Sequence, residues 1–412
     1  MDSPQWPQTL DQLRILCLAS YEKGQRFMTQ AKDLGCHVYL LTSLSLKDKA
    51  DFPRDRLDDI FYMPDRENEW NVQEMVRAVS HLCREMRINR VVPLDDFDLE
   101  KAAILREHLR LPGLGESVTR FFRDKLAMRM LAAEHKLPVP EFTSTLHNPD
   151  VAHFLSNVPS PWVLKPRLMA GAIGIKKYYG VQDTWDGIHS LGDEQSSFVL
   201  ERFIPGDIFH VDSIWFRGRM KYAVASAYGT PPLEVTHAGG IFTTRLLERE
   251  SELDKKLRSL NEKVLRAFTL ENGVSHTEFI RAHENGKIYF LETSARVGGA
   301  NIADLIEAGT GINMWAEWAK VEVAAACDYQ YEVPKPENDF AGLLVSLARQ
   351  EWPDTSSFAE PELVWRLRKR HHVGFIVKSA DYGRITELLE LYARRVQAEY
   401  HASAPPRDRV RD

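Results

Sequence analysis

Two apolar segments joined by a short turn constrain the fold more than any other part of the chain. Residues 274–282 and 287–294 alternate between apolar and polar side chains, with an Asn-Gly pair between them. So short a connection joins antiparallel neighbours of one sheet, and the two segments are therefore predicted to form a β-hairpin. Each strand carries a glutamate, Glu278 in the first and Glu292 in the second, among largely apolar neighbours. Two acids in such strands require a chemical explanation.

The register of this hairpin decides whether the two acids meet. Residues paired across an antiparallel hairpin have a constant number sum and share a face, so Glu278 opposes Glu292 only when that sum is even. A two-residue turn at the Asn-Gly pair makes the sum odd and separates the acids. We therefore predict a three-residue loop, 284–286, with Gly286 in a left-handed conformation, and a five-residue loop would preserve the same register.

A divalent cation explains the two acids if they face each other. Alternation places Glu278 on one face with His276, and Glu292 on one face with Phe290. Facing carboxylates repel, so one of them stays protonated unless a cation lies between them. Mg²⁺ prefers such oxygen ligands and completes its shell with water and phosphate oxygens, and Mn²⁺ is the alternative ion. A structural pair of acids with Arg296 as partner is the competing interpretation.

A lysine beside a glycine-rich loop indicates a polyphosphate site. Residues 163–166 form an apolar strand that delivers Lys165, and a loop containing Gly171 and Gly174 follows. Free backbone N–H groups of such a loop cover phosphates while the ammonium group neutralises their charge. A flexible hairpin without a ligand would have the same sequence pattern.

A third segment could bind an adenine ring. Residues 198–206 form an apolar strand that ends in a Pro-Gly pair. Backbone groups at Arg202 and Ile204 could pair with the edge of an adenine as a neighbouring strand would. An ordinary edge strand is the alternative.

The first 112 residues alternate between strand and helix patterns, which predicts a parallel sheet covered by helices. No GxGxxG sequence follows the first strand, so a typical NAD-binding site is excluded. Asp95 and Asp96 follow the third predicted strand at its carboxyl end, where open parallel sheets bind ligands, and a helix N-cap or turn role is the alternative. The predicted strands are 14–19, 37–41 and 90–94, and the predicted helices are 23–34, 71–86 and 97–109.

Beyond this region the pattern becomes richer in strands. Ser117 is expected to cap a helix that runs to His135 and contains Asp124 and Lys125 in its interior. Alternating strands fill much of the segment from 198 to 245, and a long helix follows at 252–270. The remaining predicted helices are 301–307, 312–326 and 382–400.

Composition excludes several classes of function. Lys and Arg number 53 against 59 Asp and Glu, and the resulting net charge of -6 makes nucleic acid a poor partner. The cysteines are scattered without metal or redox spacing, and no apolar run approaches the roughly 18 residues that span a membrane. We expect a cytoplasmic protein with free thiols, without membrane insertion. The cysteines are Cys17, Cys36, Cys83 and Cys327.

Taken in this order and spacing, the segments between Leu13 and Ala326 resemble the ATP-grasp superfamily. The resemblance implies an α/β fold in which an N-terminal Rossmann-like parallel-sheet domain precedes a two-lobed α+β ATP-grasp fold and a C-terminal strand-rich segment. The expected boundaries are 1–112 for the Rossmann-like domain, 113–205 for the small lobe with the glycine loop, 206–330 for the large lobe with the metal site, 331–402 for a C-terminal α+β subdomain and 403–412 for a disordered tail.

The resemblance also implies roles for individual residues. Lys125, in the sequence Arg123-Asp124-Lys125, and Lys165 would reach the nucleotide phosphates, and Glu201 would help to hold the nucleotide at a hinge between the lobes. The implied ATP-binding residues are Lys125, Lys165, Gly171, Gly174, Glu201, Arg202 and Ile204. The implied metal ligands are Glu278 and Glu292, and the implied catalytic residues are Lys165 and Arg296, of which Arg296 steadies the transferring phosphoryl group.

Two positions depart from the family pattern. Ser294 stands where many members have an asparagine that binds a second metal ion, so Ser294 is retained as a candidate metal ligand. Ile208 stands where many members have a glutamate for the ribose hydroxyls, and Asp207 or His210 could take its place.

A looser resemblance concerns the substrates. The sequences that end in Gly298-Gly299 and begin at His237 are similar to those of carboxylate-amine ligases that join amino acids or related acids. His237, Gly298 and Gly299 would then contact substrate, although a loop histidine flanked by glycines is often an ordinary surface residue.

The implied reaction transfers the ATP γ-phosphoryl group to a small carboxylate, and an amine then captures the acyl phosphate. Small-molecule acids and amines are the expected partners, and the resemblance is compatible with a homodimer. One alternative is activation of bicarbonate or formate on the same fold. Another is a catalytically inactive nucleotide-binding protein.

Overall fold

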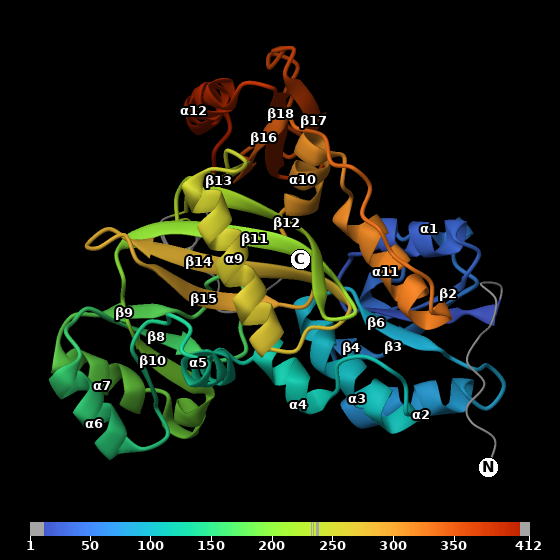
Figure 1. Ribbon diagram of the computed structural model, residues 1–412, viewed down its shortest axis with the longest axis horizontal. Helices are drawn as coiled ribbons and strands as arrows, with labels where there is room; N and C mark the ends of the chain where they lie inside the picture. The colour runs from blue at the N-terminus through green and yellow to red at the C-terminus, as the bar shows by residue number, and fades with distance from the viewer. Residues whose placement is uncertain (1–11, 232, 234, 236–238, 404–412) are drawn as a thin grey trace.

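The computed structural model describes residues 12–403 except 232, 234 and 236–238. Its strands form a four-stranded sheet near the N-terminus, a second four-stranded sheet, an eight-stranded sheet and a two-stranded ribbon. Figure 1 shows the N-terminal sheet at the right, the second sheet at the lower left and the eight-stranded sheet between and above them. We call the units built on these sheets the N-terminal domain, the small lobe and the large lobe. No helix in the described residues is long and apolar enough to cross a membrane.

The N-terminal domain has the predicted parallel sheet, in the order β3-β2-β1-β6. The strands β1 and β6 are almost completely buried because helices cover the sheet, which explains their continuous apolar sequences. The edge strand β3 is largely half-exposed and was not predicted. The elements are β1 (Arg14–Ala19), α1 (Gln25–Asp33), β2 (His37–Ser43), β3 (Asp59–Met63), the ribbon β4 (Asp65–Arg66) and β5 (Glu69–Trp70), α2 (Val72–Leu82), β6 (Arg90–Pro93) and α3 (Leu99–Leu109).

The connection to the small lobe corrects one prediction. The helix expected from Ser117 to His135 is divided into α4 (Glu116–Thr119), a short 3-10 turn and α5 (Lys125–Glu134). Asp124 begins the second helix because its carboxylate accepts hydrogen bonds from the backbone N–H groups of Leu126 and Ala127. Lys125 is therefore the first residue of α5 and does not lie in a helix interior.

The small lobe is an antiparallel sheet in the order β7-β10-β8-β9. The predicted strand that carries Lys165 is β8, and the glycine-rich loop joins it to its antiparallel neighbour β9. The elements are β7 (Phe142–Ser144), α6 (Asn148–Asn157), β8 (Trp162–Pro166), β9 (Lys176–Tyr178), α7 (Val181–His189) and β10 (Phe198–Arg202).

The large lobe is built on one continuous sheet in the order β15-β14-β11-β12-β13-β16-β18-β17. Strands from the C-terminal segment extend this sheet through the pairing of β13 with β16. We retain the boundaries predicted at residues 112, 205, 330 and 402 as a proposal. The elements are β11 (Gly206–Phe216), β12 (Arg219–Tyr228), β13 (Phe242–Leu246), α9 (Glu252–Ala267), β14 (Gly273–Ala282), β15 (Ile288–Ser294), α10 (Ile302–Thr310), α11 (Met314–Cys327), β16 (Phe340–Leu347), β17 (Leu363–Arg366), β18 (His372–Ser379) and α12 (Tyr382–Glu399).

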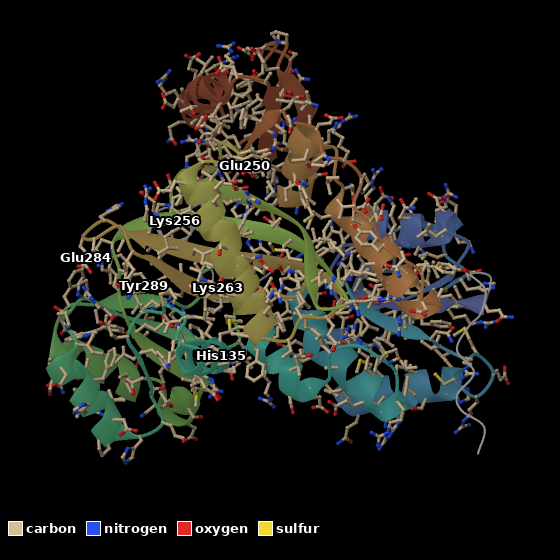
Figure 2. All side chains as sticks on the ribbon, viewed as in Figure 1. His135, Glu250, Lys256, Lys263, Glu284 and Tyr289 are labelled. Atoms are coloured by element: carbon tan, nitrogen blue, oxygen red, sulfur yellow. The ribbon has the colours of Figure 1, made fainter. Side chains whose placement is uncertain are left out.

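The helix α9 shows how one face of this sheet is covered. Leu257 and Val264 are completely buried and belong to the same apolar cluster as Phe279 of β14. Lys256 and Lys263 lie outside this buried stripe of the helix and are exposed (Figure 2). This 3.6-residue periodicity fixes the helix on one face and leaves the other face of the hairpin for polar chemistry.

The hairpin places Glu278 directly opposite Glu292, as predicted. The predicted three-residue loop is wrong, because Ala282 pairs with Lys287 through its N–H and the loop spans 283–286. Gly286 has the predicted positive φ, 69°. This loop makes the number sum of paired residues odd as far as Phe290. The register then shifts by one residue at Leu291, which has no partner across the hairpin and forms a β-bulge.

The bulge also corrects the predicted face of Phe290. Phe290 pairs with Phe279, and both side chains are buried in the apolar cluster beneath α9. Leu291 and Glu292 both line the same cavity, which lies on the face opposite Phe290. Because a bulge adds one residue to a strand, it reverses the alternation and brings the second acid to the face of the first.

Candidate active site

A cavity of about 480 Å³ lies where the N-terminal domain, the small lobe and the large lobe meet. Its walls come from the loop after β6, the start of α5, β8 with its glycine loop, β10 with its exit, and the β14–β15 hairpin. The predicted site residues that line it are Lys125, Lys165, Gly171, Glu201, Arg202, Ile204, Glu278, Glu292, Ser294, Arg296 and Gly299. The structure therefore gathers side chains from segments far apart in the sequence around one space.

At one side of the cavity, Glu201 is held between two cations. Its carboxylate lies 2.8 Å from Lys165 Nζ and 3.0 Å from Arg129 Nε, and its side chain is completely buried. Burial raises the pKa of Glu201, but the Arg129 and Lys165 charges outweigh this and lower it to about 2. The carboxylate is therefore ionised and fixes the ammonium group of Lys165 at the cavity wall.

Sequence reasoning missed Arg129. It lies one turn after Lys125 on α5, so the two cations share a helix face, and this spacing was the available signal. Arg129 also donates to the carbonyl of Leu291, the unpaired residue of the bulge. One guanidinium group thus connects Glu201 with the bulge that orients Glu292.

Lys125 connects the glycine loop with one of the two acids. Its Nζ lies 2.9 Å from Glu292 Oε2 and donates to the Met169 carbonyl at 2.6 Å. The base of the same loop is fixed by Arg167, whose guanidinium pairs with Asp124. The Arg-Asp-Lys sequence therefore anchors the loop through side chains that precede and begin α5.

Glu278 and Glu292 have the donor chemistry of a divalent cation site. Glu278 Oε1 accepts a hydrogen bond of 2.8 Å from Tyr228, and Glu292 pairs with Lys125 through Oε2. Within the described residues the second oxygen of each carboxylate has no hydrogen bond. Two carboxylates that each offer a free oxygen on one face fit the preference of Mg²⁺ for hard oxygen ligands.

A buried cluster stands behind Glu278. Asp212 accepts from two imidazoles, His210 Nδ1 at 2.7 Å and His276 Nδ1 at 2.9 Å. Burial lowers the pKa of His276, but Asp212 more than compensates and raises it to about 9. The charged His276 lies 3.7 Å from Glu278 Oε1 and, together with Tyr228, lowers the pKa of Glu278 despite its burial.

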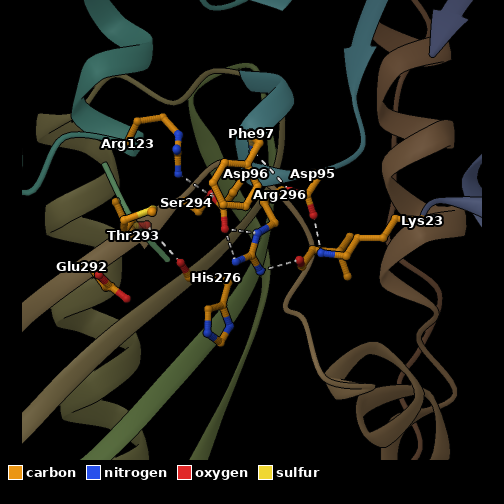
Figure 3. A network of polar contacts seen from close by, with 12 residues as sticks. Lys23, Asp95, Asp96, Phe97, Arg123, His276, Glu292, Thr293, Ser294 and Arg296 are labelled. Carbon is orange, nitrogen blue, oxygen red and sulfur yellow. Dashed lines mark hydrogen bonds and ion pairs between the residues drawn. The ribbon is translucent and has the colours of Figure 1, made fainter. Parts of the chain in front are cut away.

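The N-terminal domain enters the site through Asp96 (Figure 3). Asp96 accepts from Arg296, with Nε at 2.8 Å, and from the hydroxyl of Ser294. Burial opposes ionisation of Asp96, but Arg296 and then Arg123 hold its pKa well below the usual range, and Asp96 raises the pKa of Arg296. Asp96 therefore fixes two predicted site residues of the large lobe from outside that lobe.

Asp95 has the turn-capping role considered for this loop, and it also lines the cavity. It caps the 3-10 turn that follows by accepting from Phe97 N–H at 3.1 Å, and it pairs with Lys23. Lys23, Asp95 and Phe97 also line the cavity (Figure 3). Asp95 therefore both caps this turn and lines the cavity.

Other predicted residues lie elsewhere. Asp207 is not among the cavity-lining residues and pairs with Arg281 at 2.6 Å, whereas its neighbour Ile208 does line the cavity. His210 is buried behind the wall and also contacts the Thr244 hydroxyl. Gly174 and Gly298 do not line the cavity, and a Cβ on Gly298 would meet Asp212 and His276 at about 3 Å. His237 falls outside the described residues.

Curated proteins with similar sequences are amino-acid ligases. No family model matches the chain. The chain is 24% identical over 242 residues to an L-arginine-specific L-amino acid ligase of Bacillus subtilis, covering 57% of this chain and 58% of that protein. It is 24% identical over 296 residues to alanine–anticapsin ligase of Bacillus subtilis strain 168, covering 65% of this chain and 60% of that protein. The matches thus span about three fifths of the length of these relatives.

Solved structures share the architecture over nearly the whole chain. An L-amino acid ligase from Bacillus licheniformis superimposes with a TM-score of 0.73 at 17% identity, covering 94% of this chain and 98% of that chain. A carboxyaminoimidazole ribonucleotide synthase from Aspergillus clavatus, solved with ATP, gives a TM-score of 0.72 at 14% identity, covering 94% of this chain and 99% of that chain. These likenesses establish the fold, and at such low identity they carry no assignment of substrate.

Proposed function

Because the chain belongs to the ATP-grasp superfamily, we propose that it is a carboxylate-amine ligase that uses Mg-ATP to activate a small acid. The acid becomes an acyl phosphate, an amine captures it, and ADP and phosphate are released. The named activities of the curated relatives support an amino acid or a related compound as the acid, and a second amino acid or similar amine as the acceptor.

One observation carries this proposal. Glu278 lies opposite Glu292 on the wall of the same cavity that receives Lys125 and Lys165. Acids that bind a divalent cation, placed next to lysines and a glycine loop, suit a triphosphate better than an uncharged ligand. We assign Glu278 and Glu292 as ligands of Mg²⁺, or of Mn²⁺ as its alternative, with Ser294 as a further candidate beside them.

The lysines and the loop would bind the phosphates. Lys165 and Lys125 are each held in one side-chain conformation by a carboxylate. Their remaining N–H groups are therefore already positioned to donate to phosphate oxygens. Gly171, with a φ of 69°, lies on the cavity wall in a loop that could cover the phosphates and exclude water. Backbone groups at Arg202 and Ile204 would pair with the adenine edge.

The chemical steps follow from these positions. A carboxylate oxygen of the acid attacks the γ-phosphorus as the bond to ADP breaks. Mg²⁺ held by Glu278 and Glu292 would neutralise charge on the phosphate oxygens. The amine nitrogen then attacks the acyl carbon, the bond from that carbon to the phosphate oxygen breaks, and the departing phosphate takes up the proton that the nitrogen loses. Arg296, steadied by Asp96, would stabilise the negative charge on the phosphoryl group during both steps.

A substrate screen tests the proposal. Pairs of amino acids and small acids are incubated with the enzyme and Mg-ATP, ADP release is recorded, and products are identified by mass spectrometry. The proposal expects ADP release that requires both an acid and an amine, with an amide as product. A carboxylated or formylated product would favour the alternative reactions, and nucleotide binding without turnover on any pair would favour an inactive binding protein.

A further inference from the structure

A second cavity, of about 290 Å³, lies in the seam between the N-terminal domain and the large lobe. It shares no lining residue with the candidate active site within the described parts of the chain. Its walls come from the start of β6, from α3 and the loop at 112–115, from the residues that follow α9, and from α11. Nothing in the proposed reaction uses this space.

Arg90 lines this cavity, and its guanidinium group has no hydrogen-bond acceptor among the described residues. It is 7% exposed and makes no side-chain hydrogen bond to any described residue. Its one ion pair in the described part of the chain is with Glu322, and the Nε to Oε2 distance of 3.8 Å is too long for a hydrogen bond. The other oxygen of Glu322 accepts from Trp318 Nε1 at 3.1 Å.

A second buried arginine increases the positive charge. Arg106 is 7% exposed, and among residues 12–403 that the structure describes it donates only to the backbone carbonyls of Val91 and Leu114. Burial lowers the pKa of Arg106 to about 10, so it stays protonated at neutral pH. Two arginines therefore face one largely buried carboxylate, that of Glu322. Glu271 also lines the cavity, but its side chain is exposed to solvent.

Buried arginines are normally paired and hydrogen-bonded, because a desolvated guanidinium group without acceptors is destabilising. We propose that the cavity binds a small anion, a carboxylate or phosphate compound, whose oxygens accept hydrogen bonds from Arg90. The planar guanidinium fork suits such a bidentate acceptor, and Thr269 and Asn272 offer neutral polar groups nearby. The volume lies at the lower end of ligand pockets, which restricts the ligand to a small molecule.

The cavity lies between two units that also meet at the active site. The walls belong to two units, so a bound anion adds contacts across the seam that Asp96 and Arg296 also bridge. Ala295 lines this cavity, whereas its chain neighbours Ser294 and Arg296 line the active-site cavity. An anion held here would add contacts between the two units, and its binding does not depend on the proposed reaction.

Titration calorimetry with sodium phosphate and, separately, sodium malonate tests the site, with chloride at equal ionic strength as reference. We expect one of the two anions to bind the wild-type chain, and which one binds distinguishes phosphate from carboxylate ligands. Arg90→Met should weaken this binding at least ~10-fold, because a charge-assisted contact is lost. Arg87→Met, which removes an exposed arginine three residues earlier in the chain, should bind as the wild type does.

A second variant keeps the test decisive if Arg90→Met does not fold. Glu322→Gln removes the carboxylate that competes for Arg90, so it should strengthen anion binding. Absence of binding of either anion to the wild type, equal binding by Arg90→Met, or weaker binding by Glu322→Gln would overturn the proposal. The Arg90–Glu322 pair would then be an ordinary contact between two units.

Discussion

Asp96 of the N-terminal domain binds Arg296 of the large lobe through the guanidinium Nε, at 2.8 Å, and through a second guanidinium nitrogen. This contact positions the arginine assigned to the phosphoryl group, so the N-terminal domain contributes to the site. We expect Asp96→Asn to lower kcat/KM for the acid at least ~10-fold, because the amide cannot compensate a buried guanidinium charge. ATP affinity should change less than threefold.

Steady-state kinetics and nucleotide titration of the same preparation check this prediction. Asp55→Asn, which alters an exposed aspartate of the same domain, is the matched control. An Asp96→Asn enzyme with wild-type kcat/KM would remove Arg296 from the role proposed here.

Lys165→Ala should weaken ATP binding by roughly 10- to 100-fold, since a phosphate loses a charge-assisted donor. Lys176→Ala changes an exposed lysine at the other end of the glycine loop and should bind ATP normally. Fluorescence titration with a labelled ATP analogue measures both variants. Equal affinity of Lys165→Ala and the wild type would show that Lys165 does not contact phosphate.

Glu292→Gln should retain the fold and lose metal-dependent ADP formation, because a neutral amide is a poor ligand for a hard cation. Binding of Mn²⁺ in the presence of an unreactive ATP analogue, followed by electron paramagnetic resonance, gives a readout independent of turnover. Glu284→Gln, in the exposed loop of the same hairpin, is the control. Unchanged Mn²⁺ binding by Glu292→Gln would place the metal site elsewhere.

The pairing of His276 with Asp212 predicts a pH dependence of stability. The pKa of His276 is raised to about 9, so its contribution is complete below its unfolded pKa of about 6.5 and is lost as pH rises through about 9. His210, the other imidazole against Asp212, has a pKa lowered by burial and stays neutral in this window.

Urea denaturation of the metal-free protein between pH 6.5 and 9.5 measures this contribution, which should be on the order of 3 kcal/mol. The decline should be absent in His276→Gln and present in His283→Gln, which alters an exposed histidine of the same hairpin. A decline of equal size in both variants would mean that another group titrates.

The local sequence pattern was enough to predict many of the helices and strands. The strand predicted at 14–19 has those bounds because a fully buried parallel strand reads as one apolar run. The prediction that Glu278 lies opposite Glu292 is confirmed although the predicted loop was wrong. The bulge at Leu291 changes the number sum of paired residues from odd to even before the two acids are reached. A bulge depends on the contacts of the finished sheet, here a hydrogen bond from Arg129, which alternation alone does not reveal.

Contacts between residues far apart in the sequence were the hardest to predict from the sequence. Asp96 was noted only as a residue at a strand end, and its partner Arg296 lies 200 positions later. The helix expected from Ser117 was divided because Asp124 caps a new helix, a signal that the apolar periodicity across this segment obscured. The ribose candidates Asp207 and His210 have partners away from the cavity wall, which only tertiary packing decides.

In the proposed reaction an acyl phosphate connects the cleavage of ATP with the formation of the amide. Once the acid is identified, it is supplied with both carboxylate oxygens as ¹⁸O, and the released phosphate is analysed by mass spectrometry. An acyl phosphate intermediate places one ¹⁸O atom in each phosphate formed, because the carboxylate oxygen that attacks the γ-phosphorus leaves with the phosphate. Phosphate without ¹⁸O, released in step with the amide, would contradict an acyl phosphate intermediate.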